Sequence, residues 1–385
     1  MTRQKSVKKY YRHHTKRAKI IFDSIMTLTN ENDKIEGWRV ETMVFSTNDT
    51  GFSDKWIIET VEKGYVGEYA SLVLESKEKV HIAYYDYING DLKHAESGPD
   101  GWIIEKVDQE GTVGQFLSLA KGEGEKIYIS YRDQGKNQLK IAAFDGNRWT
   151  IDVVDDEPFA SIDTSIFVDT LERVYISYYN FSEGYLKLAT RDREQWKIEI
   201  VDDGQNQSNA VGGFSSVKVD SVGRIHISYI DSVNGFLKYA IKENDLWKIE
   251  VADDEGSVSN FTSLALDKEG NPYISYTVDK RPNKPDLWLA KKVGGEWKVE
   301  LVDTAAIVGQ FSSIVVDPHS NIYISYSAGS KLKLAKNIQG VWDFELVDHD
   351  GTVQYTSLSI DTDGMPHIAY YDKDSGVKYA HKIRG

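Results

Sequence analysis

The sequence predicts an all-β fold, a seven-bladed β-propeller, from its repeats, its strand pattern and its composition. Seven copies of one segment end on a strand that begins with Trp, and the intervals between these Trp residues are 46, 47, 47, 51, 50 and 45 residues. Four short apolar runs separated by turn residues fill each interval, as in a propeller blade. The 23 Tyr and 9 Trp also favour strands. The seven Trp are Trp56, Trp102, Trp149, Trp196, Trp247, Trp297 and Trp342.

The first strand of each copy has an aromatic-x-Ser-aliphatic core, and in the third copy Asp163 replaces the aromatic residue. A small hydroxyl suits a crowded position near the axis, where it can bond a neighbouring backbone group. Seven equivalent Ser residues therefore indicate a structural role, because catalysis needs one distinguished nucleophile with a base. They are Ser71, Ser118, Ser165, Ser216, Ser263, Ser313 and Ser357.

The second strand has the pattern [His/Tyr]-Ile-[Ala/Ser]-Tyr. His and Tyr alternate in one slot, with His at positions 81, 226 and 367. This exchange favours a packed ring with a polar tip over a metal ligand or an acid–base group.

The third strand reads Leu-Lys-x-Ala, as in Leu92-Lys93, and the fourth strand carries an acid three residues after its Trp, as in Glu105. We expect these Lys and acidic side chains to pair across the two strands at an exposed rim. Such charges would also discourage aggregation between sheet edges.

Strand counting predicts how the ring closes. There are seven first strands, but only six fourth strands follow them, because the chain ends on a third strand at Lys378–His381. The early strand Trp56–Val61 supplies the missing fourth strand. We therefore expect a propeller over residues 56–385 and an extension over residues 1–55, in which the segment Trp38–Val44 predicts an extra outer strand.

The extension is basic and the rest of the chain is acidic. Residues 1–19 hold eight Lys and Arg and no acid, so the net charge of −14 divides into +8 and −22. Residues 5–28 predict an amphipathic helix docked on the propeller. Self-association through residues 1–35 and a nucleic-acid contact are the alternatives, although we do not expect nucleic acid to be the main partner.

Several functional classes are excluded by what the sequence lacks. Without Cys there are no disulfides, thiol nucleophiles or Cys-based zinc sites. No apolar run is long enough to span a membrane, and no signal peptide is evident, so a cytoplasmic location is the default expectation. No catalytic residue can be named, because no nucleophile elbow, phosphate loop or metalloprotease motif occurs.

Acidic residues recur in the loops that join fourth to first strands and second to third strands, which should share one face. The second-strand set, taken here as candidate ligand-binding residues, is Asp86, Asp133, Asn180, Asp231 and Asp372. A ring of such groups would attract cations or bond polyhydroxyl ligands. Turn chemistry is the competing interpretation. Calcium binding is a third, so no cofactor is expected apart from a possible Ca²⁺.

Departures from the repeat give further candidate ligand-binding residues, since binding loops differ on a repeated scaffold. The fifth copy has an unusual loop over residues 278–286, with Lys280, Arg281 and Lys284, and Trp288 fills the slot of the third-strand Lys.

The repeats TSLALDKEGNPYISY and TSLSIDTDGMPHIAYYDKDSGVKYA resemble those of bacterial and archaeal propellers broadly similar to sialidase-like (BNR-type) and seven-bladed lectin-like propellers. The Asp-box of sialidases is not matched, so their arginine triad and nucleophilic Tyr cannot be carried onto this chain. The resemblance implies an extracellular or particle-associated location. We expect a non-enzymatic module that presents glycan or protein contacts on its loop face. A sialidase-like hydrolase or lyase is the alternative.

Overall fold

The computed structural model describes residues 54–157, 160–193, 195–204, 210–279, 284–304 and 307–384. The predicted helix over residues 5–28, the strand at Trp38, and the loop residues Lys280 and Arg281 lie outside these ranges.

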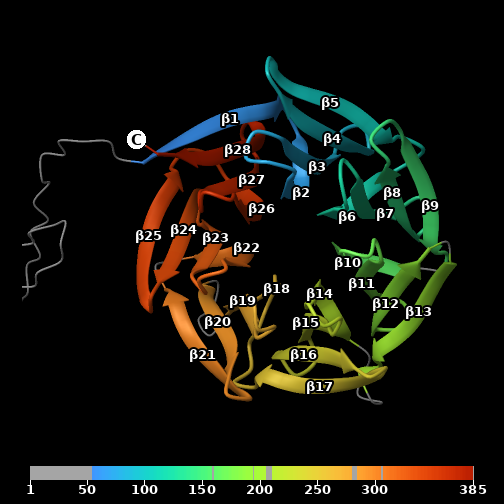
Figure 1. The fold of residues 1–385 in the computed structure, drawn as a ribbon, viewed down its shortest axis with the longest axis vertical. Helices are drawn as coiled ribbons and strands as arrows, with labels where there is room; N and C mark the ends of the chain where they lie inside the picture. The colour runs from blue at the N-terminus through green and yellow to red at the C-terminus, as the bar shows by residue number, and fades with distance from the viewer. Residues whose placement is uncertain are drawn as a thin grey trace, which may run out of the picture. The chain divides into compact units, whose positions relative to one another are not determined.

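Seven four-stranded antiparallel sheets surround a central axis (Figure 1), which confirms the seven-bladed propeller. In each blade the first strand of the repeat is innermost and the fourth is outermost. The strands of the first three blades are β2 (Val66–Leu74), β3 (Val80–Asp86), β4 (Asp91–Gly98) and β5 (Gly101–Asp108); β6 (Val113–Lys121), β7 (Ile127–Asp133), β8 (Gln138–Phe144) and β9 (Trp149–Asp155); and β10 (Ala160–Val168), β11 (Val174–Asn180), β12 (Tyr185–Asp192) and β13 (Gln195–Asp202).

The next three blades follow the same order. They comprise β14 (Val211–Val219), β15 (Ile225–Asp231), β16 (Phe236–Glu243) and β17 (Leu246–Asp253); β18 (Ser263–Leu266), β19 (Pro272–Val278), β20 (Asp286–Val293) and β21 (Glu296–Asp303); and β22 (Val308–Val316), β23 (Ile322–Ala328), β24 (Lys331–Ile338) and β25 (Val341–Asp348).

The seventh blade joins the two ends of the described chain. It combines β26 (Val353–Ile360), β27 (Pro366–Asp372) and β28 (Gly376–Ile383) with β1 (Lys55–Lys63) as its outermost strand. β1 pairs antiparallel with β28, with Ile57 opposite His381 and Thr60 opposite Lys378 (Figure 1). This is the pairing that the missing fourth strand predicts.

The innermost strands carry a bulge at the aromatic position of the repeat. In β2, Tyr69 and Ala70 lie opposite the single residue Tyr84 of β3. The residue at this position has a positive φ in all seven blades, between 51° and 59°, although none is glycine. A left-handed conformation costs a residue with a side chain roughly 1 kcal/mol or more, so the surrounding packing must hold it in place.

The Ser column links neighbouring blades, which confirms its structural role. Each Ser Oγ accepts the backbone N–H of an innermost-strand residue in the next blade, at 2.9–3.2 Å, and Ser357 closes the circle on Leu72 of β2. Because every blade supplies one acceptor and one donor, these seven bonds form a closed ring.

The Tyr that recurs in the second strand of every blade makes a second set of contacts between blades. All seven Tyr are fully buried, and each donates its hydroxyl hydrogen to an acid at the end of the outermost strand of the preceding blade, at 2.5–2.7 Å. Burial raises the pKa of Tyr131 far above its usual value, so the phenol stays a donor. The seven are Tyr84, Tyr131, Tyr178, Tyr229, Tyr276, Tyr326 and Tyr370.

The predicted pairing of the third-strand Lys with the fourth-strand acid is wrong. Lys93 is buried and contacts Glu62 at 2.7 Å and Asp86 at 2.9 Å. The regular pairing of β4 with β5 from their turn at Gly98 and Gly101 places Lys93 opposite Lys106, while Glu105 lies opposite His94. Because successive side chains of a strand point to opposite faces, Lys93 and Glu105 lie on opposite faces of the sheet. The Lys side chain therefore points into the junction with the preceding blade.

The fourth-strand acids instead accept hydrogen bonds from the Trp of the next blade. Trp Nε1 donates to the acid at 2.8–3.1 Å in five blade junctions. One of them joins Trp56 of β1 to Glu345 of β25 at 2.9 Å, so the closing strand makes the same contact as the others.

The His slot of the second strand is buried, as predicted. His81, His226 and His367 are at most 3% exposed, and each Nε2 lies within hydrogen-bond distance of an acid in the turn that precedes its strand. Burial lowers the pKa of all three. No helix within the described part of the chain is long and apolar enough to cross a membrane.

Candidate ligand-binding face and axial channel

The predicted acidic residues of the second-to-third loops are buried in their own turns. Asp86 is 1% exposed, and its Oδ1 accepts the backbone N–H groups of Ile88 and Asn89 at 3.1 Å. The equivalent residues bond the same turn positions in their blades. The turn-chemistry interpretation therefore accounts for these groups, and they do not converge because each lies in a different blade. Their role in ligand binding stays a prediction.

The fifth-blade candidates are partly described. Lys284 is exposed, and Trp288 is half-buried in β20 opposite Tyr276. Lys280 and Arg281 lie outside the described residues, so binding by this loop also stays a prediction.

The axis of the propeller contains a cavity of about 320 Å³, to which all seven blades contribute. Its wall has two levels, the bulged residues and the Ser column below them. Six of the bulged residues are aromatic, and their neighbouring rings lie 4.2–5.0 Å apart between centroids. We call them the aromatic collar: Tyr69, Phe116, Phe214, Phe261, Phe311 and Tyr355.

Asp163 interrupts the aromatic collar between Phe116 and Phe214. One carboxylate oxygen accepts the backbone N–H of Phe214 at 3.1 Å. Burial raises the pKa of Asp163 to about 6, and the hydrogen bond from Phe214 only partly offsets this effect. This carboxyl group can therefore exchange a proton near neutral pH.

The loop face carries two pairs of aromatic rings. In each pair an exposed ring lies against a more buried one. Tyr87, 61% exposed, meets Tyr85 at 6.5 Å between ring centroids, and Phe181, 62% exposed, meets Tyr179 at 6.3 Å. Both contacts are edge-to-face, the geometry that aromatic rings prefer.

Two further Tyr residues belong to the connection from β1 to β2 and to β27 of the closing blade. Tyr65 is 62% exposed, and its backbone C=O accepts the N–H of Tyr87 at 3.2 Å. The buried ring of Tyr371 lies next to Gly67 of β2. We call these six residues the aromatic crescent: Tyr65, Tyr371, Tyr85, Tyr87, Tyr179 and Phe181.

Two charged side chains belong to the same blades as the aromatic crescent or to the blade between them. Glu68 of β2 lies opposite Tyr85 of β3, and Arg132 of β7 is half-buried, with its Nη2 donating to Asn137 Oδ1 at 3.0 Å. Burial lowers the pKa of Arg132 and raises that of Glu68, so both charges are incompletely solvated. Charged and aromatic groups thus occur in the same sector of the ring.

The aromatic crescent was not predicted from the sequence, although a signal for it exists. The residue after the recurring second-strand Tyr is Tyr85, Arg132, Tyr179 or Tyr371 in four adjacent blades. In the other three blades it is Ile230, Thr277 or Ser327. This column breaks the sevenfold pattern, whereas the loop acids repeat it.

No group of three or more His, Asp or Glu side chains suited to a metal ion occurs among the described residues.

The comparisons with known proteins show the fold. The sequence matches no protein-family model and no curated protein. A polysaccharide lyase, an ulvan lyase bound to -[GlcA(1-4)Rha3S]-, is 13% identical, with a TM-score of 0.55 over 83% of this chain and 95% of that one. The SapL1 lectin in complex with alpha methyl fucoside is 13% identical, with a TM-score of 0.50 over 74% and 97% of the two chains.

A third similar structure is the Hadza microbial sialidase Hz136, which is 12% identical, with a TM-score of 0.51 over 76% of this chain and 73% of that one. Identities of 12–13% support the architecture and carry no residue roles from these proteins to this chain. The chain is accordingly a seven-bladed β-propeller whose structural neighbours include lectins, polysaccharide lyases and a sialidase.

Proposed function

We propose that this protein binds carbohydrate at the aromatic crescent, on the loop face of the propeller. The observation that carries the proposal is the departure from sevenfold repetition in four adjacent blades, which carry exposed aromatic rings together with Arg132 and Glu68. A repeated scaffold keeps its structural residues in every blade, so residues specific to one sector are candidates for recognition.

The chemistry of the aromatic crescent suits a sugar. Tyr87 and Phe181 expose large rings whose positions are fixed by the rings beneath them, so little conformational freedom is lost on binding. Arg132 and Glu68 supply a donor and an acceptor for hydroxyl or carboxylate groups. The lectin and the lyase among the similar structures were each solved with a carbohydrate, which agrees with this ligand class.

A glycan array with the full chain tests the proposal. We expect binding to a restricted set of glycans, and at least a tenfold loss of affinity in the double variant Tyr87→Ala, Phe181→Ala. Both side chains are largely exposed, so the variant should fold normally. Phe344→Ala is the matched control, because Phe344 is a partly exposed ring on the outer strand β25. Absence of glycan binding, or equal binding by the double variant, would contradict the proposal.

Catalysis on a glycan is the second candidate, and Asp163 favours it. A carboxyl group with a pKa of about 6 can donate a proton at neutral pH, as the acid of a glycosidase does. A panel of chromogenic glycosides and uronate-containing polysaccharides tests this candidate. Turnover abolished by Asp163→Asn would favour an enzyme, and binding without turnover would favour the lectin-like function.

A protein partner on the same face, self-association through residues 1–35 and an extracellular or particle-associated location remain predictions of the sequence.

A further inference from the structure

A second axial cavity, of about 560 Å³, lies on the other side of the Ser column from the aromatic collar. The seven Ser line both cavities, so they form a ring between an upper and a lower chamber. Two residues beyond each Ser, the innermost strands place one further side chain. These are Val73, Ala120, Phe167, Lys218, Ala265, Val315 and Ser359.

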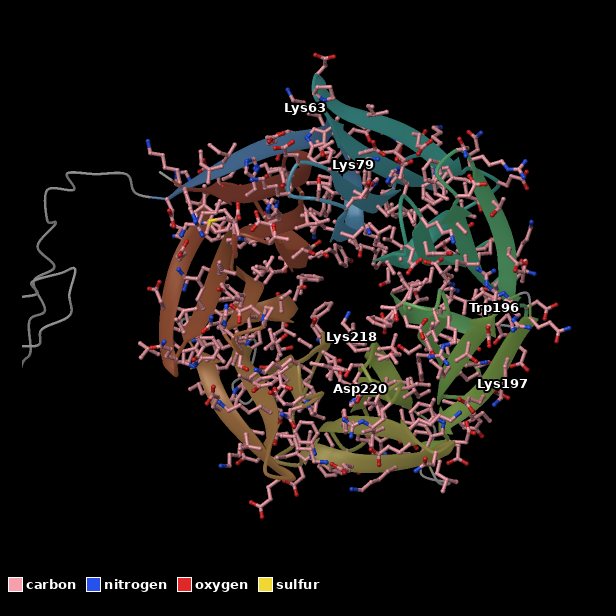
Figure 2. All side chains as sticks on the ribbon, viewed as in Figure 1. Lys63, Lys79, Trp196, Lys197, Lys218 and Asp220 are labelled. Atoms are coloured by element: carbon pink, nitrogen blue, oxygen red, sulfur yellow. The ribbon has the colours of Figure 1, made fainter. Side chains whose placement is uncertain are left out.

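Lys218 is the one charged residue in this column. Figure 2 shows it on β14, directed at the central opening. The nearest described group is the ring of Phe167, whose centroid lies 5.7 Å from Nζ, and no carboxylate of the described residues pairs with this Nζ. The channel leaves part of Lys218 accessible to water, but the enclosing wall lowers its pKa. An unpaired ammonium in such a site is costly for the folded protein.

The acids at the lower rim are already engaged. Asp220 Oδ2 accepts Arg224 Nε at 2.5 Å and lies 3.2 Å from His226 Nε2. Asp267 accepts the amide of Asn271 at 2.9 Å. Asp163 is a further acid of the channel wall, but it lines the upper chamber, beyond the Ser ring.

The Ser ring adds hydrogen-bond donors to this positive charge. Each Ser Oγ accepts a backbone N–H, so its own hydrogen is available to a further acceptor. None of these seven hydroxyl groups donates a hydrogen bond to another of the described residues. Seven hydroxyl donors and one ammonium therefore face a water-accessible space on the axis.

We propose that the lower chamber binds a small oxyanion, such as sulfate or phosphate, between the Ser ring and Lys218. An anion would neutralise the unpaired ammonium and accept hydroxyl hydrogens, whereas a cation would be repelled by that ammonium. The site is separate from the aromatic crescent and does not depend on the proposed function.

Calorimetric titration of the full chain with inorganic sulfate and with inorganic phosphate tests this site. We expect one saturable site per chain, with affinity at least tenfold weaker in Lys218→Met. Lys197→Met is the matched control, because Lys197 lies on the outer strand β13 with its side chain 69% exposed (Figure 2), and it should bind like the wild type. Tyr87→Ala should also leave the affinity unchanged.

A measurement without a variant keeps the test valid if Lys218→Met does not fold. Labelling of the wild-type chain with an amine-reactive reagent, mapped by mass spectrometry, should show Lys218 protected by sulfate and Lys197 unprotected. Titration with galactose 6-sulfate distinguishes two sources of the anion, a free ion and a sulfate group carried by a sugar. The sulfate ester should bind only if the site accepts a sulfated sugar. Absence of saturable binding, or equal affinity in Lys218→Met, would overturn the site.

Discussion

Asp163 and Lys218 occupy columns that hold uncharged side chains in the other six blades. The channel wall shifts their pKa values in opposite directions, upward for Asp163 and downward for Lys218, because burial disfavours either charge. Neither residue is required by the repeat, since aromatic or small residues fill the same positions elsewhere. Both therefore reduce the stability of the ring where they stand, which makes them candidates for function rather than for structure.

Replacing Asp163 should stabilise the folded protein in a pH-dependent way. Its pKa is about 6 in the folded state against 3.8 ordinarily, so above pH 6 the folded protein holds an unfavourable buried carboxylate. That cost fades as the pH falls from 6 towards 3.8, because the folded state then keeps a proton that the unfolded state releases. We expect Asp163→Asn to raise the free energy of unfolding by roughly 1–2 kcal/mol at pH 8.

Urea unfolding of both chains at pH 8 and pH 4 measures this difference. The gain in Asp163→Asn should be much smaller at pH 4, since Asn keeps an acceptor for the N–H of Phe214. A stability difference between the two chains that does not change with pH would show that the Asp163 carboxyl group of the folded protein is ionised at both pH values.

At the scale of the element, six blades are built from four consecutive strands, and the seventh takes its outermost strand from the other end of the propeller sequence. That strand is β1, which completes the seventh blade. Val61 of β1 is buried with residues of the first and seventh blades, and Trp56 packs against the cluster between the sixth and seventh. Lys382 Nζ of β28 also lies 5.9 Å from the Trp56 ring, so β1 contributes packing as well as backbone pairing.

Deletion of residues 1–61 should therefore be severely destabilising. It removes most of β1, exposes the edge of β28 and opens the apolar cluster around Trp56, at a cost of about 3–5 kcal/mol by comparison with large-to-small core substitutions. Deletion of residues 1–35 alone is the control and should change stability little. Thermal unfolding of the two truncated chains separates them, and equal melting of the 1–61 deletion and the full chain would refute the role of β1.

The whole ring is linked by contacts that cross every blade junction. The seven Ser–amide bonds and the seven Tyr–carboxylate bonds leave no junction without a specific polar link. An open stack of repeats can lose its end units first, but a closed ring has no ends. The stability of each blade is therefore tied to that of its neighbours.

We expect the full chain to unfold in one cooperative transition. The calorimetric enthalpy should match the van't Hoff enthalpy, and the 1–61 deletion should show a broader transition because its ring is open. Hydrogen exchange provides the independent check, since the amides bonded to the Ser ring should exchange at similar rates in all seven blades. Blade-by-blade exchange in the full chain would argue against the closed ring as the cooperative unit.

The sequence by itself determined the architecture. A repeat of about 50 residues with four apolar runs predicts a four-stranded blade, and seven copies predict seven blades. The unmatched Trp56 strand predicts how the two ends of the ring are joined. Ser in all seven first strands and His or Tyr in one slot were also sufficient to predict structural roles, because these inferences need only comparison between copies. All of these signals are local or periodic.

Only the tertiary structure decided which side chains meet. The register of β4 with β5 places Lys93 opposite Lys106, so Lys93 and Glu105 point to opposite faces of the sheet, and this register is not visible in a pattern of strand residues. The loop acid Asp86 is buried because its own turn donates to it. The aromatic crescent brings together residues of blades that are distant in the sequence, and Lys218 points into a channel that all the blades enclose. Both features follow from the curvature of the ring rather than from any one repeat.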